Sequence, residues 1–135
     1  MTALQNAALA TLVLSLSACS LLPAKTDSEQ VEARSQERLD QLMAGNIEKA
    51  YAFSTPGYRE ANTLARFRAD HAAGVSRYVS AKVKSASCEQ DACTVMVNVS
   101  YKYVSSIGSK PMIVDRATQE RWIRTDGQWW FLRLN

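Results

Sequence analysis

The stretch QERWIRTDGQWWFL, residues 119–132, decides how this chain folds. Its centre, Asp126-Gly127, is a dipeptide favoured in two-residue hairpin turns, in which both positions take a positive φ. Such a turn places Thr125 opposite Gln128 and fixes every cross-strand pair below it. One face of the hairpin then carries Gln119, Arg121, Ile123, Trp130 and Leu132. The stretch therefore predicts an antiparallel hairpin at the end of the chain.

The other face of this hairpin is aromatic and charged. It sets Trp122 opposite Phe131, Arg124 opposite Trp129 and Glu120 opposite Arg133, which are an aromatic pair, a cation over a ring and a charge pair. This is more aromatic surface than a bare protein face usually carries. The face therefore either packs beneath another element or makes a protein contact, with a second copy of the chain or with a different protein. The candidate interface residues are Trp122, Trp129 and Phe131.

The hydrophobic period separates helices from strands in the rest of the chain. Helical spacing predicts helices over Glu29 to Ala44, Ile47 to Phe53 and Asn62 to Ala73, with Asn62 as an N-cap and Ser54-Thr55-Pro56-Gly57 as a stop. Alternation predicts strands over Tyr78 to Ser87, Thr94 to Val104, Val114 to Arg124 and Trp129 to Leu134. Helices followed by an antiparallel sheet predict an α+β fold.

Cys88 and Cys93 flank the tip of the first predicted hairpin. In an oxidising compartment we expect them to form a disulfide. The alternatives are free thiols or a metal pair, although the single histidine is too isolated to complete a zinc set. Regular pairing from Cys88 opposite Cys93 would place the apolar residues of the two strands on opposite faces. We therefore predict a one-residue bulge, which puts Val79, Ala81 and Val83 on the apolar face of the second strand.

Composition indicates one globular domain and argues against nucleic acid as a partner. The 135 residues are 47% hydrophobic and 21% charged, which suits one core rather than two. The 16 basic and 13 acidic residues are spread through the chain, without a run of Lys or Arg to follow a phosphate backbone. We expect no cofactor and no metal.

Residues 1–18 are typical of a signal peptide that is removed. Residues 7–18 are apolar or small, a run too short for a permanent membrane-spanning helix. The run ends in Leu16-Ser17-Ala18-Cys19, which resembles the bacterial lipobox, whose cysteine receives the lipid and becomes the first mature residue. The alternative is a plain secretory signal with an incidental cysteine. The opening MTALQNAAL lacks the usual Lys or Arg, which leaves open whether translation starts at Met1.

Lipidation of Cys19 would hold the domain at a membrane surface without spanning it, because two acyl chains already give stable anchoring. The lipoprotein resemblance implies retention at the inner membrane when an Asp follows the cysteine. Ser20 stands there instead. We therefore expect an outer-membrane lipoprotein that faces the periplasm, with residues 19–28 as lipidated cysteine and tether and residues 29–135 as a single domain.

The order of elements and five short motifs resemble the nuclear transport factor two-like superfamily. The motifs are Leu42-Met43-Ala44-Gly45-Asn46, Ala50-Tyr51-Ala52-Phe53, Thr55-Pro56, Tyr58-Arg59 and Asp126-Gly127-Gln128-Trp129-Trp130. The resemblance covers about residues 29 to 135. It implies a cystatin-like cone in which three helices close a curved antiparallel sheet around a possible ligand site or active site. The superfamily contains ketosteroid isomerases, polyketide cyclases and binding modules without chemistry, so the fold does not choose among functions.

An enzyme of this fold would need an acid or a base inside the cone. Asp70 and His71 are the candidate catalytic residues, although neighbouring helix residues point about 100° apart. Tyr51, Tyr101 and Arg121 are candidate ligand-binding residues, and Arg121 inside the cone would meet an acidic group. The structural alternatives are a helix-surface position for His71, core or rim packing for the tyrosines and contact with water for Arg121.

These expectations favour a lipid-anchored, non-enzymatic binding or protein-interaction module of the cell envelope. The alternative is a small-molecule enzyme, similar to an isomerase or cyclase, with its site in the cone pocket. A carrier of an apolar ligand is a third class, which would require a large apolar cavity.

Overall fold

The C-terminal hairpin forms with the register that its turn dictates. In the computed structural model Thr125 pairs with Gln128, and the pairs below it follow in step. Asp126 and Gly127 take φ values of 52° and 73°, as a two-residue hairpin turn requires. The prediction for this hairpin is confirmed.

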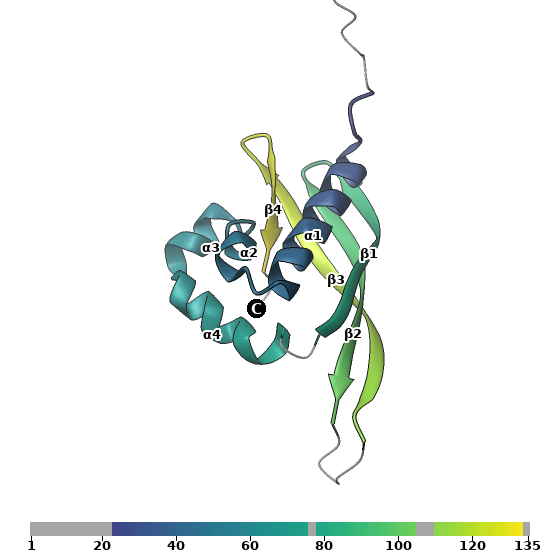
Figure 1. Ribbon diagram of the computed structural model, residues 1–135. Helices are drawn as coiled ribbons and strands as arrows, with labels where there is room; N and C mark the ends of the chain where they lie inside the picture. Colours follow the sequence, from purple (N-terminus) through teal and green to yellow (C-terminus); the bar gives the residue numbers. More distant parts are fainter. Residues whose placement is uncertain (1–22, 76–77, 105–109, 134–135) are drawn as a thin grey trace, which may run out of the picture.

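The structure describes residues 23–75, 78–104 and 110–133. The described helices are α1 (Asp27–Met43), α2 (Ile47–Tyr51), α3 (Pro56–Ala61) and α4 (Leu64–Val75). The strands are β1 (Tyr78–Glu89), β2 (Ala92–Tyr103), β3 (Met112–Thr125) and β4 (Gln128–Leu132), joined in this order in one antiparallel sheet (Figure 1). The fold is therefore α+β, as predicted. The predicted signal peptide and Cys19 lie outside the described residues.

Helix α1 begins at a capping box. The Thr26 hydroxyl accepts a hydrogen bond from the backbone N–H of Glu29 at 3.3 Å, and the Glu29 carboxylate accepts one from the Thr26 backbone at 2.8 Å. These bonds start the helix two residues before the predicted position. Its buried side chains recur at helical spacing at Val31, Ser35, Arg38, Leu39 and Leu42. This stripe includes a serine and an arginine, and both have partners on the sheet.

Helix α3 was not predicted, because Thr55-Pro56 was interpreted as a stop. Thr55 instead acts as an N-cap whose hydroxyl accepts from the Tyr58 N–H at 3.2 Å, and Pro56 takes the first helical position. The expected N-cap of the next helix, Asn62, is the C-cap of α3. The Thr63 hydroxyl accepts a backbone hydrogen bond at the start of α4. The prediction of Asn62 as an N-cap was wrong.

The first hairpin contains the predicted disulfide and the predicted bulge. Cys88 and Cys93 are bonded, with their Cα atoms 4.0 Å apart. The register shifts by one residue between Val83 and Ser85, which brings Val83 opposite Val97 on the apolar face. A second shift, between Tyr78 and Ser80, leaves Val79 without a partner on β2 and 47% exposed.

The core lies between α1 and the inner face of the sheet, which is the face that carries Val95, Val97 and Trp122. Its buried members are Val31, Leu39, Phe53, Ala81, Cys93, Val95, Val97, Val99, Trp122 and Trp129, with Phe131 partly buried against them. The aromatic hairpin face therefore packs beneath the helices. Trp122 and Trp129 are 0% and 2% exposed and are not available for an interface, which corrects that interpretation.

Both edges of the sheet are covered, the β1 edge by side chains of α1 and the β4 edge by the backbone of the segment before α3. On β1, Gln36 accepts from the Val83 N–H at 2.9 Å and Glu32 accepts from the Ala86 N–H at 2.8 Å. On β4, Phe131 donates its N–H to the carbonyl of Phe53 at 2.8 Å. Edge strands with free N–H and C=O groups tend to pair with other chains. The outer face of the sheet is therefore more open to a partner than its edges are.

The two hairpin tips lie at the same end of the molecule as the start of α1 (Figure 1). Arg124 joins all three, because its guanidinium contacts Asp27 at 2.9 Å and Asp91 at 2.7 Å and it stacks 4.9 Å over the Trp129 ring. The last residues of β2 and the first residues of β3 lie at the opposite end. In the part of the chain that the structure describes, no helix is long and apolar enough to cross a membrane.

Candidate functional site

The inner face of the sheet carries a buried ion pair that the sequence interpretation missed. The Glu120 carboxylate accepts from Arg38 Nη1 at 2.9 Å, from Ser35 Oγ at 2.8 Å and from Trp122 Nε1 at 2.9 Å. The side chains of Arg38 and Glu120 are 5% and 10% exposed. Glu120 therefore pairs with an arginine of α1 rather than with Arg133, the partner expected from the hairpin.

Arg38 is held by stacking as well as by charge. Its guanidinium carbon lies 3.6 Å from the centroid of the Phe131 ring. Burial lowers the pKa of Arg38, and the Glu120 charge opposes that effect. Both oxygens of the Glu120 carboxylate accept hydrogen bonds, Oε1 from Arg38 and Oε2 from Ser35 and Trp122. We interpret this network as the polar contact that fixes α1 on the sheet.

Asp70 and His71 have separate partners in the structure. Asp70 lies 3.2 Å from Arg66 and 3.6 Å from Arg133, so it serves surface ion pairs. The half-buried His71 ring stacks on Phe67 with centroids 3.9 Å apart, and its Nδ1 donates to the Phe67 carbonyl at 2.8 Å. Burial lowers the pKa of His71.

The structure separates the three candidate ligand-binding residues. The Tyr51 hydroxyl donates to the Asn62 carbonyl at 2.6 Å and ties α2 to the turn before α4. Tyr101 is half-buried on the inner face, opposite Val114. Arg121 is exposed on the outer face, because it pairs with Thr94 while Glu120 points inward. The expectation that Arg121 lies inside the cone was wrong.

Arg121 stands between two hollows on the outer face. The larger, about 680 Å³, is lined by Ser87, Glu89, Gln90, Ala92, Thr94 and Arg121. The smaller, about 310 Å³, is lined by Thr94, Gln119, Glu120, Arg121 and Leu132. Arg121 and Thr94 belong to both, so the two hollows form one continuous surface across β2 and β3.

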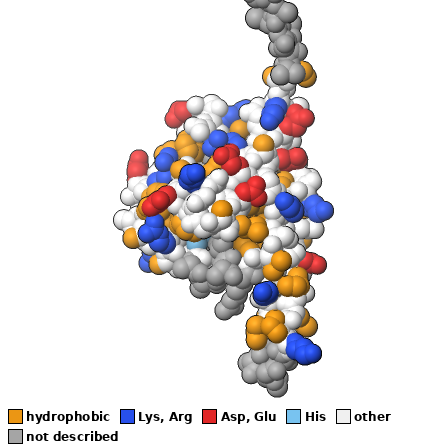
Figure 2. All heavy atoms as spheres, in the orientation of Figure 1, with side chains coloured by type: hydrophobic (Ala, Val, Ile, Leu, Met, Phe, Trp, Pro, Cys, Tyr) orange, Lys and Arg blue, Asp and Glu red, His pale blue; other side chains and the backbone are white. Residues whose placement is uncertain are grey.

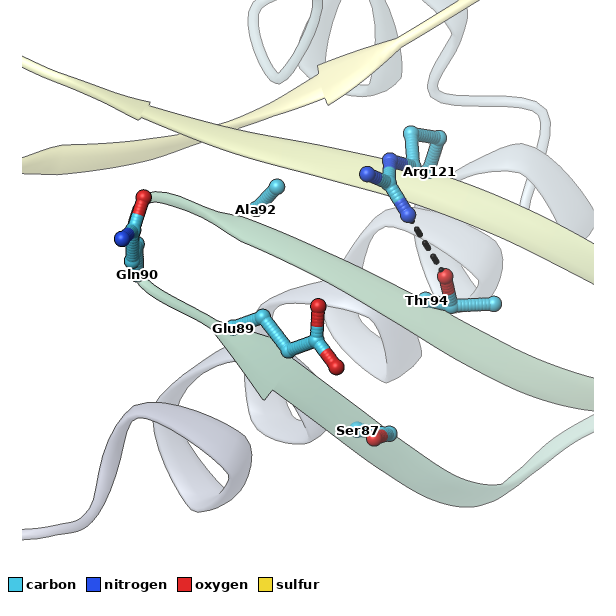
Figure 3. A pocket seen from close by; sticks show the side chains of 6 residues that line it. All are labelled: Ser87, Glu89, Gln90, Ala92, Thr94 and Arg121. Carbon is cyan, nitrogen blue, oxygen red and sulfur yellow. Dashed lines mark hydrogen bonds between the residues drawn. The ribbon is translucent and has the colours of Figure 1, made fainter.

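Figure 3 shows how the larger hollow is built. Its side chains come from three adjacent strands and the β1–β2 tip, with Glu89 on β1 and Arg121 on β3 at opposite sides of β2. Ala92, between them, has too small a side chain to fill the space. Arg121 Nη1 donates to the Thr94 hydroxyl at 2.8 Å, which holds the guanidinium over the sheet. Among the described residues, Arg121 has no ion-pair partner.

This arrangement suits binding better than catalysis. An exposed guanidinium has donors left for a carboxylate or phosphate, which it binds in a bidentate geometry. Sequence reasoning placed Arg121 on the correct face of its hairpin but missed Ser87, Glu89 and Thr94. The cross-strand register Ser87–Thr94–Arg121 was the signal for them. The Cys88–Cys93 pair sets Ser87 opposite Thr94, but the pairing of Thr94 with Arg121 became known only from the sheet. The described residues contain no group of three His, Cys, Asp or Glu side chains that could hold a metal ion.

Comparisons with known proteins identify the fold. No protein-family model matches the chain, and no curated protein does. A solution structure of a SEC-C motif-containing protein of Rhodopseudomonas palustris is similar, with a TM-score of 0.58 and 12% identity, over 76% of this chain and 74% of that one. A crystal structure of a putative NTF2-like transpeptidase of Campylobacter jejuni is similar with a TM-score of 0.52 and 13% identity, over 77% and 98%. At these identities the likeness concerns the fold alone.

Proposed function

We propose that this NTF2-like domain is a non-enzymatic interaction module of the bacterial cell envelope. In this proposal a lipid on Cys19 holds it at the outer membrane, facing the periplasm. The outer face of its sheet then contacts an acidic side chain of a protein partner at Arg121. A second copy of the chain is one such partner.

The observation that carries the proposal is the position of Arg121 between the two hollows. The shared surface spans all four strands, from Ser87 and Glu89 on β1 to Leu132 on β4, so it is an open sheet face with room for an extended segment. An extended loop of a partner fits such a surface, with its carboxylate on Arg121 and apolar atoms near Leu132. Strand addition is disfavoured, since α1 and the segment before α3 cover the sheet edges.

The Glu89 carboxylate adds specificity at the other side of the larger hollow. A partner segment with an acidic group near β3 and a basic or amide group near β1 would satisfy both walls. A uniformly acidic segment would meet repulsion at Glu89, which discriminates against it.

Photo-crosslinking in cells that make the native lipoprotein would test the outer-face contact. A photoreactive residue at Gln119, in the smaller hollow, should give a discrete crosslinked product. Arg121→Glu should abolish the product, because the guanidinium then becomes a repelling carboxylate. Arg116→Glu is the matched control, since Arg116 is an exposed arginine of the same strand on the opposite face. The absence of a product, or equal loss with both variants, would contradict the proposal.

The membrane anchor is tested separately by mass spectrometry of the mature protein. Three acyl chains on Cys19 are expected, and Cys19→Ser should leave an unmodified chain that is released from membranes. A mature protein that begins elsewhere, with Cys19 removed or unmodified, would exclude the anchor. The rival class, a cone-pocket enzyme, predicts turnover of compounds in an ester, enone and epoxide panel by the purified protein.

A further inference from the structure

Strands β2 and β3 extend beyond the rest of the sheet. The last partner of β2 on β1 is Tyr78, which lies opposite Tyr101. Pairing with β3 continues for two more residues, through Lys102 opposite Ile113 to Tyr103 opposite Met112. A two-stranded projection therefore leaves the body at the end opposite the start of α1 (Figure 1). We call it the β2–β3 arm and define it by Lys102, Tyr103, Val104, Lys110, Met112 and Ile113.

The arm is apolar where a projection into water would ordinarily be polar. Tyr103, Val104, Met112 and Ile113 are between 48% and 62% exposed. In the described part of the chain, six of the seven exposed large hydrophobic residues lie on this arm or at its base: these four on the arm, and Tyr78 and Val79 at its base. Single exposed hydrophobic residues are normal, but a cluster of this kind marks a contact surface.

The charges on the arm have one sign. Lys102 and Lys110 are both exposed, and the described residues of the arm include no Asp or Glu. Figure 2 shows hydrophobic and basic side chains together on this projection. Tyrosine with aliphatic residues and flanking lysines is the composition of segments that lie at a bilayer surface, where apolar groups enter the acyl boundary and lysines contact anionic headgroups.

We propose that the β2–β3 arm is a second membrane contact that binds the surface of a bilayer containing anionic lipid. The arm lies in the interface and does not cross it, because its outer edges carry backbone N–H and C=O groups that need water or headgroups as partners. A membrane suits the arm better than a protein does, because the arm matches anionic headgroups in charge and offers only two residue pairs for a protein interface.

The geometry allows anchor and arm to touch the same membrane. Seven residues separate Cys19 from Asp27, the first residue of α1. An extended tether of that length reaches roughly 25 Å at about 3.3–3.6 Å per residue. The domain can therefore lie with its long axis along the membrane, with α1 tethered at one end and the arm in contact at the other. This inference extends the proposed lipid anchor, but its test does not depend on lipidation.

Vesicle flotation of the unlipidated chain from Pro23 to Asn135 tests the arm. This chain keeps the α1 capping box and every described core residue, from Val31 to Trp129. We expect it to float with vesicles of phosphatidylethanolamine and phosphatidylglycerol in a 3:1 ratio, prepared at low salt. Binding should fall with pure phosphatidylcholine vesicles and with added salt. Failure of the parent chain to bind the anionic vesicles would overturn the proposal.

Two variants separate the arm from the rest of the surface. Lys102→Gln with Lys110→Gln should lower the partition coefficient about 30-fold, at roughly 1 kcal/mol for each lysine near an anionic surface. Lys82→Gln with Lys84→Gln is the matched control on β1 and should change binding much less. Equal effects of the two pairs would overturn the proposal.

Val104→Ser with Met112→Ser removes the apolar contact and leaves the charge unchanged. Binding should fall, while the thermal unfolding midpoint stays the same because both side chains are exposed. Light scattering tests whether the arm binds a second copy of the chain instead. A parent chain that is dimeric, with a monomeric serine variant, would show that the arm contacts a second copy instead of a membrane. Neither a lack of vesicle binding nor a dimer formed through the arm would change the outcome expected from crosslinking at Arg121, so the two proposals fail separately.

Discussion

Replacement of Glu120 by Gln tests how α1 is held on the sheet. The substitution keeps the size of the side chain but removes its charge, and so leaves the guanidinium of Arg38 buried at 5% exposure without a counter-charge. It also turns one carboxylate oxygen into an NH₂ group, which cannot accept from Arg38 or from Ser35 and Trp122. Breaking one partner of a buried ion pair costs about 3–5 kcal/mol.

Urea unfolding monitored by tryptophan fluorescence measures this loss. With an m-value of about 1.5 kcal/mol/M, the midpoint should fall by about 2–3 M. Adding Arg38→Met to Glu120→Gln should restore part of the stability, since no buried charge then remains and a methionine packs over Phe131.

The control for this experiment is Glu48→Gln. Glu48 pairs with Arg68 at 2.8 Å, but both side chains are more than half exposed, so its loss should change stability by less than about 1 kcal/mol. A Glu120→Gln variant as stable as the Glu48→Gln variant would refute the role given to the buried pair.

Three further predictions concern single features. Burial lowers the pKa of His71 below 6.5, so as the pH falls the unfolded chain takes up a proton before the native chain does. The free energy of unfolding should therefore decrease as the pH falls below 6.5. Urea titrations at pH 7.5 and 5.5 should show a smaller decrease for His71→Gln than for the parent chain. Gly127→Ala meets no neighbouring atom but sits at φ 73°, so its unfolding free energy should drop by about 1 kcal/mol from backbone strain alone, and an unchanged midpoint would contradict this. Reduction of Cys88–Cys93 should cost at most about 2 kcal/mol because the closed loop is short, as comparison of urea midpoints with and without dithiothreitol will show.

Local chemistry made the strand register predictable from sequence. The positive φ required at Asp126 and Gly127 fixed the last hairpin. The conflict between the cysteine pair and the apolar pattern predicted a bulge in the first hairpin, which the structure places between Val83 and Ser85. Both inferences use the strict two-residue period of a strand, in which a one-residue shift reverses every side chain.

The candidate site was less predictable because it depends on which face the helices cover. Both faces of the last hairpin carry aromatic and charged residues, so the pattern alone could not assign the core to the face of Trp122 and Phe131. The residue that distinguishes the two faces is Arg38, the ion-pair partner of Glu120, which occupies a core position in the buried stripe of α1. An arginine in such a stripe indicates a buried acidic partner, and that partner, Glu120, would have shown that Arg121 faces outward.

Helix α1 covers the edge of β1, and this matters for a protein that is confined to a membrane surface. Lipid-anchored copies share a two-dimensional space, where neighbours meet far more often than in free solution, and an uncovered strand would join them into ribbons. Such growth would need the N–H groups of Val83 and Ala86, which already donate to Gln36 and Glu32 respectively. Under the proposed anchoring, the helix that follows the tether is also the element that prevents crowded copies from pairing edge to edge through β1.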